Sequence, residues 1–518
     1  MQDTTLGSMF VRCGRRYSDL TAVRSHNGER TYGEVIDRAA RLSNVLRAHG
    51  LEPGDRVLMV LENCVEAVEV IAGITLAGLV VVPVNSGFKA SELDHVLRDS
   101  GARAVVHTDG VSTNLARSSQ AAAIDLVLHI GGSGPSAGNV LDYDSALAAA
   151  DTTLTVHRAA PDDLAIIGYT SGTTGFPKGA MVDQATLVLC IRSSVGVLRV
   201  PHYSHLAFIG GLGYAAPWWT IILPHLYVGG MVNLIRDYTV DSWFETMRRD
   251  RTTFTYCPSP LIDRFVDQAK NYPDVIEQLE TLNHSASAAT PAEIQKIIGL
   301  VGEKYFHGWG ATEIVGALTC LTRSDVVGLG DAEDRWATVG RPGPTTGLFV
   351  LDEDGNELPR GREHVGEFAV EQDTIFSGYW NNPEQTAAAF KDGRYLTGDV
   401  GWIDHAGYAY IVDRKRDMVV SGGANVYPAE VERVLRELDG VAEIAVFGIP
   451  HEKWGETVAA AVVRLPGSTL REEDVVAFAK EHLASFKKPT SVRFLDELPR
   501  NPMQKVRKDA LREMWSAT

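Results

Sequence analysis

The sequence predicts an α/β protein: a large N-terminal domain of parallel sheets flanked by helices, followed by a small α+β domain. Three observations predict this. In the N-terminal part, helical periodicity alternates with short β-branched runs, as in βαβ units. Near residue 414 this pattern changes, and the remainder, about 100 residues, has helices and strands of its own. A chain of 518 residues is also long enough to bury a sizeable core.

The N-terminal elements follow one another at the spacing of βαβ units. Apolar residues at helical spacing predict helices, and β-branched runs between them predict buried strands. Gly50 follows the first helix as its C-cap. Strands joined by helices of this size imply a parallel sheet. The predicted helices span residues 32–49, 65–76 and 91–100, the strands span 56–61, 79–84 and 104–107, and residues 132–138 form a surface loop.

The C-terminal part begins after a turn at Asp404–Gly407 that joins two short strands. Beyond it, helices are predicted at 428–438 and 471–483, and strands at 443–448, 458–464 and 492–495. The charged stretch 413–417 lies between the two patterns. We therefore expect an N-terminal domain over 1–413, a hinge at 414–417 and a C-terminal domain over 418–518.

Composition excludes several classes of protein. With 49 Lys+Arg and 66 Asp+Glu, the net charge is −17, which argues against general binding to nucleic acid or anionic membranes. The longest apolar stretch, 71–84, is shorter than the ~20 residues of a membrane span. The first residues contain no long apolar run, so we expect no secretory signal there. The cysteines are widely spaced: Cys13, Cys64, Cys190, Cys257 and Cys320. We therefore expect neither a zinc site nor a disulfide framework, but reduced thiols in a cytoplasmic protein.

The sharpest local signal is Ile167–Met181, IGYTSGTTGFPKGAM. Its glycines let the backbone wrap closely around a ligand. Backbone N–H groups, hydroxyls and Lys178 then supply donors to phosphate oxygens. The spacing is not that of a Walker A loop. On composition alone, a surface turn is an equally good interpretation.

Further motifs follow this loop in a fixed order: HGWGATE at 307–313, YLTGD at 395–399, DR at 413–414 with SGGANVYP at 421–428, and LPRNPMQK at 498–505. Together with YTSGTTGFPKGA they resemble the adenylate-forming superfamily, from about residue 10 to 515. That family includes acyl- and aryl-CoA ligases. The resemblance implies a carboxylate that attacks the α-phosphate of MgATP, giving an acyl-adenylate and pyrophosphate. The thiol of coenzyme A then displaces AMP.

The resemblance also implies residue roles. A loop of glycines, hydroxyls and a lysine would cradle the β- and γ-phosphates: Thr170, Ser171, Gly172, Thr173, Thr174 and Lys178. Thr312 would contact the α-phosphate and Glu313 would hold Mg²⁺, because a hard cation prefers carboxylate oxygens. Trp309, between Gly308 and Gly310, would lie near adenine, although a core tryptophan is the alternative.

Two charged residues would bind the rest of the nucleotide. Asp399 would accept both ribose hydroxyls, and Arg414 would support ribose and phosphate. Lys505 would bridge the carboxylate and the α-phosphate during adenylation, with an ordinary surface lysine as the alternative. Arg416 aligns with the hinge residue about which the C-terminal domain rotates in this family, where relatives often carry Asp or Lys.

The segments that select the acid depart from the family pattern. Tyr214 stands where relatives often carry His, and small residues at 285–289 stand where they carry Gly-Gly-Ala. We expect an acyl pocket lined by Gly211, Gly213, Tyr214, Ser287 and Ala288. Trp218 and Trp219 would either edge this cavity or pack in the core.

The acceptor is left open between coenzyme A and an amine. Trp454, Phe486 and Lys488 lie in segments that resemble those around the CoA nucleotide. An amide bond synthetase of the same fold is the close alternative, and loading of a carrier protein ranks lower. A non-enzymatic nucleotide-binding module would be expected to lack Glu313, Asp399 or Lys505. The expected partners are a small carboxylic acid with CoA or an amine. Oligomeric state, including a homodimer, stays open.

Overall fold

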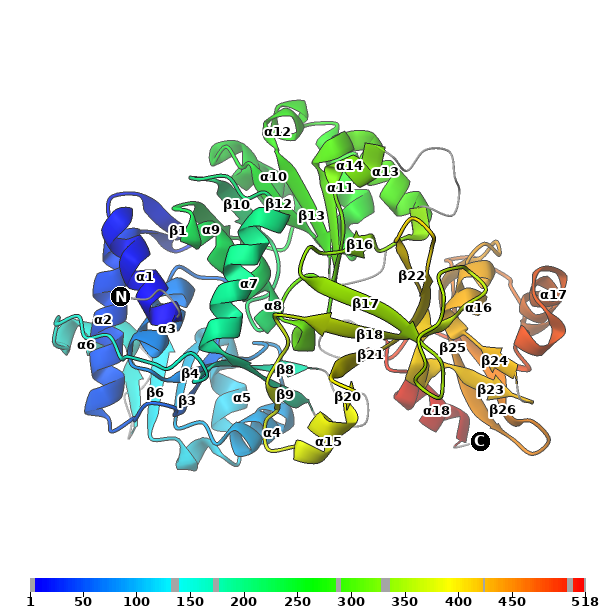
Figure 1. Cartoon of the computed structure of the whole chain (residues 1–518), viewed down its shortest axis with the longest axis horizontal. Coiled ribbons are helices and arrows are strands. Elements are labelled where there is room, and N and C mark those ends of the chain that lie inside the picture. Colours follow the sequence, from blue (N-terminus) through cyan, green and yellow to red (C-terminus); the bar gives the residue numbers. More distant parts are fainter. Residues whose placement is uncertain are drawn as a thin grey trace. The chain divides into compact units, whose positions relative to one another are not determined.

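The computed structural model describes residues 5–131, 139–170, 177–285, 290–327, 336–422, 424–500 and 506–516. The chain divides into two compact units (Figure 1). The first unit holds Met1–Gly347 and Glu371–Gly393, and the second holds Leu348–Val370 and Arg394–Thr518. The loop expected at 132–138 lies outside the described residues. The hinge expected at 414–417 is a prediction about movement between two states, and it stays a prediction.

One sheet of the first unit is built around the predicted βαβ strands. Its order is β19–β9–β8–β4–β3–β5–β6–β7, with antiparallel pairing at β19–β9 and β9–β8 and parallel pairing elsewhere. The parallel sheet expected from the sequence is confirmed. The strands are β3 (Arg56–Val60), β4 (Val80–Pro83), β5 (Ala104–Thr108), β6 (Leu126–Ile130), β7 (Val140–Asp142), β8 (Leu164–Thr170), β9 (Lys178–Asp183) and β19 (Gly378–Tyr379).

The other sheet of the first unit runs β16–β15–β14–β13–β12–β10–β11–β1–β2. It is parallel from β14 to β1 and antiparallel at its two ends. Its strands are β1 (Thr21–Ser25), β2 (Gly28–Thr31), β10 (His205–Phe208), β11 (Met231–Leu234), β12 (Phe254–Cys257), β13 (Thr281–Ser285), β14 (Tyr305–Trp309), β15 (Thr319–Leu321) and β16 (Arg341–Pro342).

Helices flank these sheets (Figure 1). The predicted ones are confirmed, and Gly50 has φ 79°, the left-handed conformation expected after a helix end. The first unit contains α1 (Leu6–Arg16), α2 (Tyr32–Ala48), α3 (Glu66–Leu76), α4 (Ala90–Ser100), α5 (Ser112–Ala116), α6 (Tyr143–Ala149), α7 (Gln184–Val197), α8 (Ala215–Pro217), α9 (Leu223–Tyr227), α10 (Val240–Arg249), α11 (Ile262–Ala269), α12 (Pro273–Gln278), α13 (Pro291–Val301), α14 (Arg323–Val327), α15 (Pro383–Ala388) and the short strand β20 (Phe390–Lys391).

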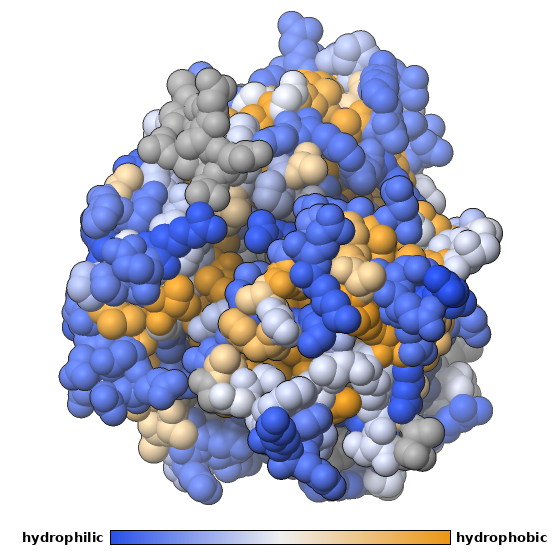
Figure 2. Space-filling view, turned by 90° about the vertical axis from the view of Figure 1, so that its right-hand side faces the viewer, coloured by the Kyte–Doolittle hydropathy of each residue, from blue (hydrophilic) through white to orange (hydrophobic). Residues whose placement is uncertain are grey.

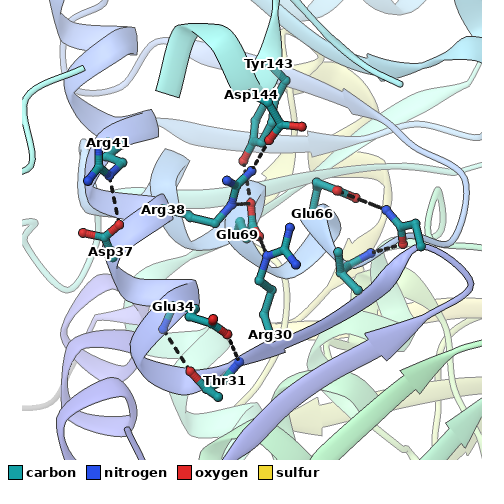
Figure 3. Close-up of polar contacts among 12 residues, drawn as sticks. Arg30, Thr31, Glu34, Asp37, Arg38, Arg41, Glu66, Glu69, Tyr143 and Asp144 are labelled. Carbon is teal, nitrogen blue, oxygen red and sulfur yellow. Dashed lines mark hydrogen bonds and ion pairs between the residues drawn. The ribbon is translucent and has the colours of Figure 1, made fainter. Parts of the chain in front are cut away.

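Helix α3 is buried along its whole length and carries a carboxylate into the core. The Glu69 side chain is fully buried and accepts hydrogen bonds from Arg30 Nε at 3.0 Å, Arg38 Nε at 2.7 Å and the Tyr143 hydroxyl at 3.2 Å (Figure 3). An unpaired buried charge is costly, so these donors are what make the position tolerable. They also join α3 to β2, α2 and α6.

The second unit contains two sheets. In one, β17–β18–β21 are neighbours and β22 pairs with β21; in the other, the order is β24–β23–β26–β25 and β27 pairs with β26 in parallel. The helices and strands predicted here are confirmed. The elements are β17 (Thr346–Leu351), β18 (Gly366–Gln372), β21 (Arg394–Ile403), β22 (Ala409–Arg414), β23 (Val419–Ser421), β24 (Ala424–Val426), α16 (Pro428–Leu435), β25 (Val441–His451), β26 (Gly455–Arg464), α17 (Glu472–His482), β27 (Ser491–Leu495) and α18 (Lys508–Ser516).

The cysteines are free and buried, as predicted. Burial raises the pKa of Cys190 to about 12 and likewise that of Cys320, so these thiols stay protonated at neutral pH. Within the described ranges, every helix is too short or too polar to cross a membrane. Figure 2 shows mostly hydrophilic side chains on the face it presents, with hydrophobic ones between them.

Candidate active site

The hairpin formed by β8 and β9 brackets the predicted phosphate loop. Thr170 ends β8, Lys178 begins β9, and the two residues are paired in the antiparallel register. The two ends of the loop are therefore side by side. The loop residues Ser171, Gly172, Thr173 and Thr174 lie outside the described residues, and their role stays a prediction.

Thr312 and Glu313 come from a single 3₁₀ turn, η6 (Thr312–Ile314), that follows β14. Gly168 lets this turn approach the hairpin, since a Cβ there would lie 3.0 Å from Thr312 Cγ2 and 2.8 Å from Ala215 Cβ. The structure thus brings Thr170 and Lys178 together with Thr312 and Glu313, although more than a hundred residues separate the two pairs in the sequence.

The motif residues before this turn shape it. Gly308 is buried in β14, and Trp309 is half-buried at its end. At Gly310 a Cβ would lie 2.6 Å from the carbonyl oxygen of Gly316, so the close turn requires glycine. The half-buried Trp309 fits the predicted adenine contact better than a core position.

The Glu313 carboxylate is held by a residue that the sequence did not single out. The Tyr379 hydroxyl donates to Glu313 Oε1 at 2.8 Å, and the Phe376 N–H donates to the Glu313 carbonyl at 2.9 Å. Lys178 Nζ lies 5.2 Å from the centroid of the Tyr379 ring. In the described part of the chain, Glu313 Oε2 accepts no hydrogen bond.

This arrangement fits a Mg²⁺ ion that arrives with a nucleotide. Mg²⁺ is usually held by one or two carboxylates plus substrate phosphates. No group of three or more His, Cys, Asp or Glu in the described ranges could hold a metal by itself. Glu313, with one oxygen fixed and the other without a partner among those residues, supplies a donor of the required kind.

Histidines beneath the motif are structural. His307 Nδ1 lies 3.1 Å from the carbonyl oxygen of His284, and Ser259 Oγ lies 2.7 Å from His284 Nε2. Burial lowers the pKa of His307 to about 4, so the ring is neutral at physiological pH. These contacts join β14 to β13, and β13 to the start of η4 (Ser259–Leu261), and so hold the strand that carries the motif. His307 belongs to a predicted motif, but no local pattern indicated that it contacts His284.

The predicted acyl pocket is partly described. At Gly213 a Cβ would lie 2.3–2.6 Å from the backbone of Val84 and Asn85, so glycine is required where β4 ends. Asn85 Nδ2 donates to the Tyr214 hydroxyl at 3.3 Å, and burial raises the Tyr214 pKa. A Cβ at Gly211 would contact this ring at 3.4 Å. Ser287 and Ala288 lie outside the described residues.

The two adjacent tryptophans pack in the core. Trp218 and Trp219 are fully buried and begin a π-helix, η3 (Trp218–Ile222). Trp218 Nε1 donates to the Leu212 carbonyl at 2.9 Å, which fixes the glycine-rich segment beside Tyr214. Core packing is therefore the better interpretation for both.

In the second unit, Asp399 and Arg414 face each other across β21 and β22. Arg414 Nε lies 2.5 Å from Asp399 Oδ1, and Asp399 is buried while Arg414 is exposed. Gly398 has φ 70° and the Thr397 hydroxyl accepts the Asp399 N–H at 3.0 Å, so the Thr-Gly-Asp motif forms a tight local turn. The two predicted ribose ligands are thus neighbours.

The predicted hinge residue Arg416 lies in a 3₁₀ turn, η8 (Lys415–Asp417), directly after β22. The Asp413 carboxylate before it accepts the Ala429 N–H at 2.7 Å and so caps the start of α16. The turn therefore lies between two anchored elements. Arg416 itself is exposed.

The predicted CoA residues lie on loops of the second unit. Trp454, in the connection between β25 and β26, is 39% exposed and stacks on His451 at 4.3 Å between ring centroids. Phe486 is 45% exposed in η9 (Ser485–Lys487), and Lys488 Nζ lies 3.4 Å from the Ser485 carbonyl. Aromatic rings exposed to this extent suit stacking on a base. Lys505 lies outside the described residues.

Comparison with known proteins bears on the whole chain. Residues 10–380 match the family model described as AMP-binding enzyme, and residues 430–505 match that of the AMP-binding enzyme C-terminal domain. The chain belongs to the AMP-binding enzyme family. The resemblance and the fold class inferred from the sequence are therefore confirmed.

Individual members of the AMP-binding enzyme family match over nearly their full length. A feruloyl-CoA synthase of Amycolatopsis is 32% identical over 515 residues, which cover 99% of this chain and 100% of the relative. ATP-bound MatB of Rhodopseudomonas palustris is 31% identical with a TM-score of 0.86, covering 98% and 99% of the two chains. The amide bond synthetase McbA of Marinactinospora thermotolerans has a TM-score of 0.85 at 24% identity, covering 99% and 100%, and shows the fold alone.

Proposed function

We propose that this protein is an AMP-forming acid:CoA ligase that activates a small carboxylic acid with ATP. The observation that carries the proposal is the meeting of Lys178, Thr312 and Glu313 at the loop end of the β8–β9 hairpin. Phosphoryl transfer needs positioned donors and cations around a spread of negative charge, and this end of the hairpin offers both. Membership of the AMP-binding enzyme family supports the same assignment.

In the first half-reaction, the carboxylate of the acid attacks the α-phosphate and pyrophosphate leaves. Mg²⁺, held by Glu313, would neutralise phosphate charge. Lys178 would neutralise the leaving pyrophosphate, and the Thr312 hydroxyl would donate to the α-phosphate. Asp399 accepts the ribose hydroxyls with Arg414 beside it. Lys505 bridges the attacking carboxylate and the α-phosphate.

The proposal is tested by the products. Pyrophosphate and AMP are measured with a panel of acids, each with CoA, with an amine, or with neither acceptor. Carboxylate-dependent pyrophosphate release with AMP as the nucleotide product is the expected result. Release of ADP and phosphate with every accepted acid would contradict it.

For the second half-reaction we propose coenzyme A as the acceptor. The feruloyl-CoA synthase relative supports it, and so do the exposed rings of Trp454 and Phe486. An amine is the second candidate, favoured by one observation: Tyr214, bonded to Asn85, stands where many CoA ligases carry His. We also propose a cytoplasmic location, supported by the free thiols of all the cysteines.

The combined change Phe486→Ala and Lys488→Glu is expected to raise the KM for CoA by about tenfold or more. Stacking of a base on an aromatic ring contributes about 1–3 kcal/mol, and the charge reversal adds repulsion to phosphate. The KM values for ATP and acid should stay near wild type. Steady-state kinetics with each substrate varied in turn measure this. Lys480→Glu, the same charge change at an exposed site on α17, is the control. An unchanged KM for CoA, with an amine as the better acceptor, would favour the amide synthetase.

Arg416→Pro is expected to slow transfer to CoA more than adenylation. Proline fixes φ near about −65° and restricts the residue before it, so the turn η8 can no longer serve as a pivot. Each half-reaction is followed separately by rapid quench, with pyrophosphate and acyl-CoA as the signals. Arg416→Ala, which keeps the backbone free, should retain both rates. Equal slowing of the two half-reactions by Arg416→Pro would argue against a hinge at this residue.

A further inference from the structure

The Tyr379 side chain contacts two charged residues at the loop end of the β8–β9 hairpin, Glu313 and Lys178. Its hydroxyl donates to Glu313 Oε1 at 2.8 Å, and its face lies 5.2 Å from Lys178 Nζ. We infer that Tyr379 is a positioning residue. It orients the Glu313 carboxylate toward the metal, and it keeps Lys178 from pairing with that carboxylate. This inference rests on the proposed function.

The carboxylate geometry supports the first part. With Oε1 fixed by the hydroxyl, the plane of the Glu313 carboxylate is set, and in the described part of the chain Oε2 accepts no hydrogen bond. A half-buried carboxylate without such a donor would sample several rotamers. Donors that orient a metal-binding carboxylate contribute strongly to metal affinity, since they remove the cost of ordering the ligand.

The charges support the second part. An ion pair between Lys178 and Glu313 would occupy a carboxylate oxygen that the metal needs. Within the described residues, neither Lys178 nor Glu313 forms an ion pair. The aromatic face stabilises the ammonium group without supplying a carboxylate. Lys178 therefore has no carboxylate partner among the described residues and is available to an anionic ligand.

The backbone holds Tyr379 in this place. Strand β19 pairs with β9, with Tyr379 opposite Ala180, and the Trp380 N–H donates to the Gly179 carbonyl at 2.8 Å. Phe376, whose N–H reaches the Glu313 carbonyl, packs edge-on against the Tyr379 ring at 4.9 Å between centroids. The segment 376–380 thus joins the strand that carries Lys178 to the turn that carries Glu313.

The test measures ATP binding without turnover. The Kd for ATP is determined by calorimetry, in the absence of acid, with saturating Mg²⁺ and again with EDTA. The ratio of the two Kd values is the gain in affinity due to the metal. Tyr379→Phe is expected to lower this gain by about 10-fold, since loss of a partner that orients a metal ligand typically costs 10–100-fold in metal affinity. Its Kd in EDTA should match wild type, because the ring remains over Lys178.

Three further variants make the outcome decisive. In a Glu313→Gln background, Tyr379→Phe should have no additional effect, because the hydroxyl acts through that carboxylate. Tyr379→Leu, which also removes the ring, should weaken ATP binding in EDTA by roughly threefold. Tyr143→Phe removes the same kind of bond, a tyrosine hydroxyl to Glu69 (Figure 3), and should keep the wild-type gain.

An unchanged metal gain in Tyr379→Phe would overturn the inference, whether both Kd values stay at wild type or both rise by the same factor. Failure of the wild-type protein to bind ATP at all would instead contradict the proposed function. Thermal unfolding of each variant separates a loss of fold from a loss of positioning.

Discussion

Replacing Lys505 by alanine is expected to slow adenylation by about 10²–10³-fold, the usual cost of removing one contact that stabilises developing charge. Transfer from a supplied acyl-adenylate should stay close to wild type. The reason is that the bridge between the carboxylate and the α-phosphate is needed only while the new bond forms. Pyrophosphate release measures the first step, and acyl-CoA formation from synthetic acyl-adenylate measures the second.

The control for this experiment is Lys508→Ala. Lys508 is a nearby lysine whose Nζ pairs with Glu432 at 2.9 Å, and it has no proposed role in either step. It should leave both rates unchanged. If Lys505→Ala slowed both steps equally while the protein remained folded, Lys505 would have to act in binding rather than in adenylation alone.

Asp399→Ala is expected to lower kcat/KM for ATP by about 10²–10⁴-fold, because hydrogen bonds to charged groups contribute about 1.5–3 kcal/mol each and two ribose hydroxyls lose their acceptor. Both half-reactions should suffer, since the AMP moiety is bound in each. This distinguishes Asp399 from Lys505. The change also removes the partner of Arg414 across the two strands. ATP saturation curves for adenylation and AMP inhibition of transfer measure the two effects.

A conservative variant and a control variant accompany this experiment. Asp399→Asn keeps one acceptor oxygen and should lose less than Asp399→Ala. Glu443→Gln removes an exposed carboxylate of the same unit that pairs with Arg500, and exposed pairs contribute little. A kcat/KM for ATP that is unchanged in Asp399→Ala would remove Asp399 from the nucleotide site.

Local patterns predicted the elements well. The helix at 32–49 could be read from its periodicity and its C-terminal glycine, and the structure ends it at Ala48 with Gly50 left-handed. The turn predicted at Asp404–Gly407 is also present: it joins β21 to β22, and Gly407 has φ 89°. Such signals depend on residues close in sequence, where propensity and capping decide the conformation.

Partners that are distant in sequence could not be predicted. Tyr379 reaches Glu313 only because β19 pairs with β9, and nothing near residue 379 indicates that pairing. Asn85 likewise meets Tyr214 because the end of β4 passes beside Gly213. Both contacts follow from tertiary packing of a parallel sheet and its loops. The motifs therefore indicated the residues proposed to bind the ligand, whereas the residues that hold them in place required the structure.

The buried thiols make the proposed domain motion accessible to labelling. Since burial raises the pKa of each native cysteine, maleimide reagents, which need the thiolate, should leave all of them unmodified in the folded enzyme. A cysteine introduced at one exposed position in each unit can then carry a donor and an acceptor dye without removal of any native residue. Fluorescence energy transfer between the dyes would follow the two units through the catalytic cycle in real time.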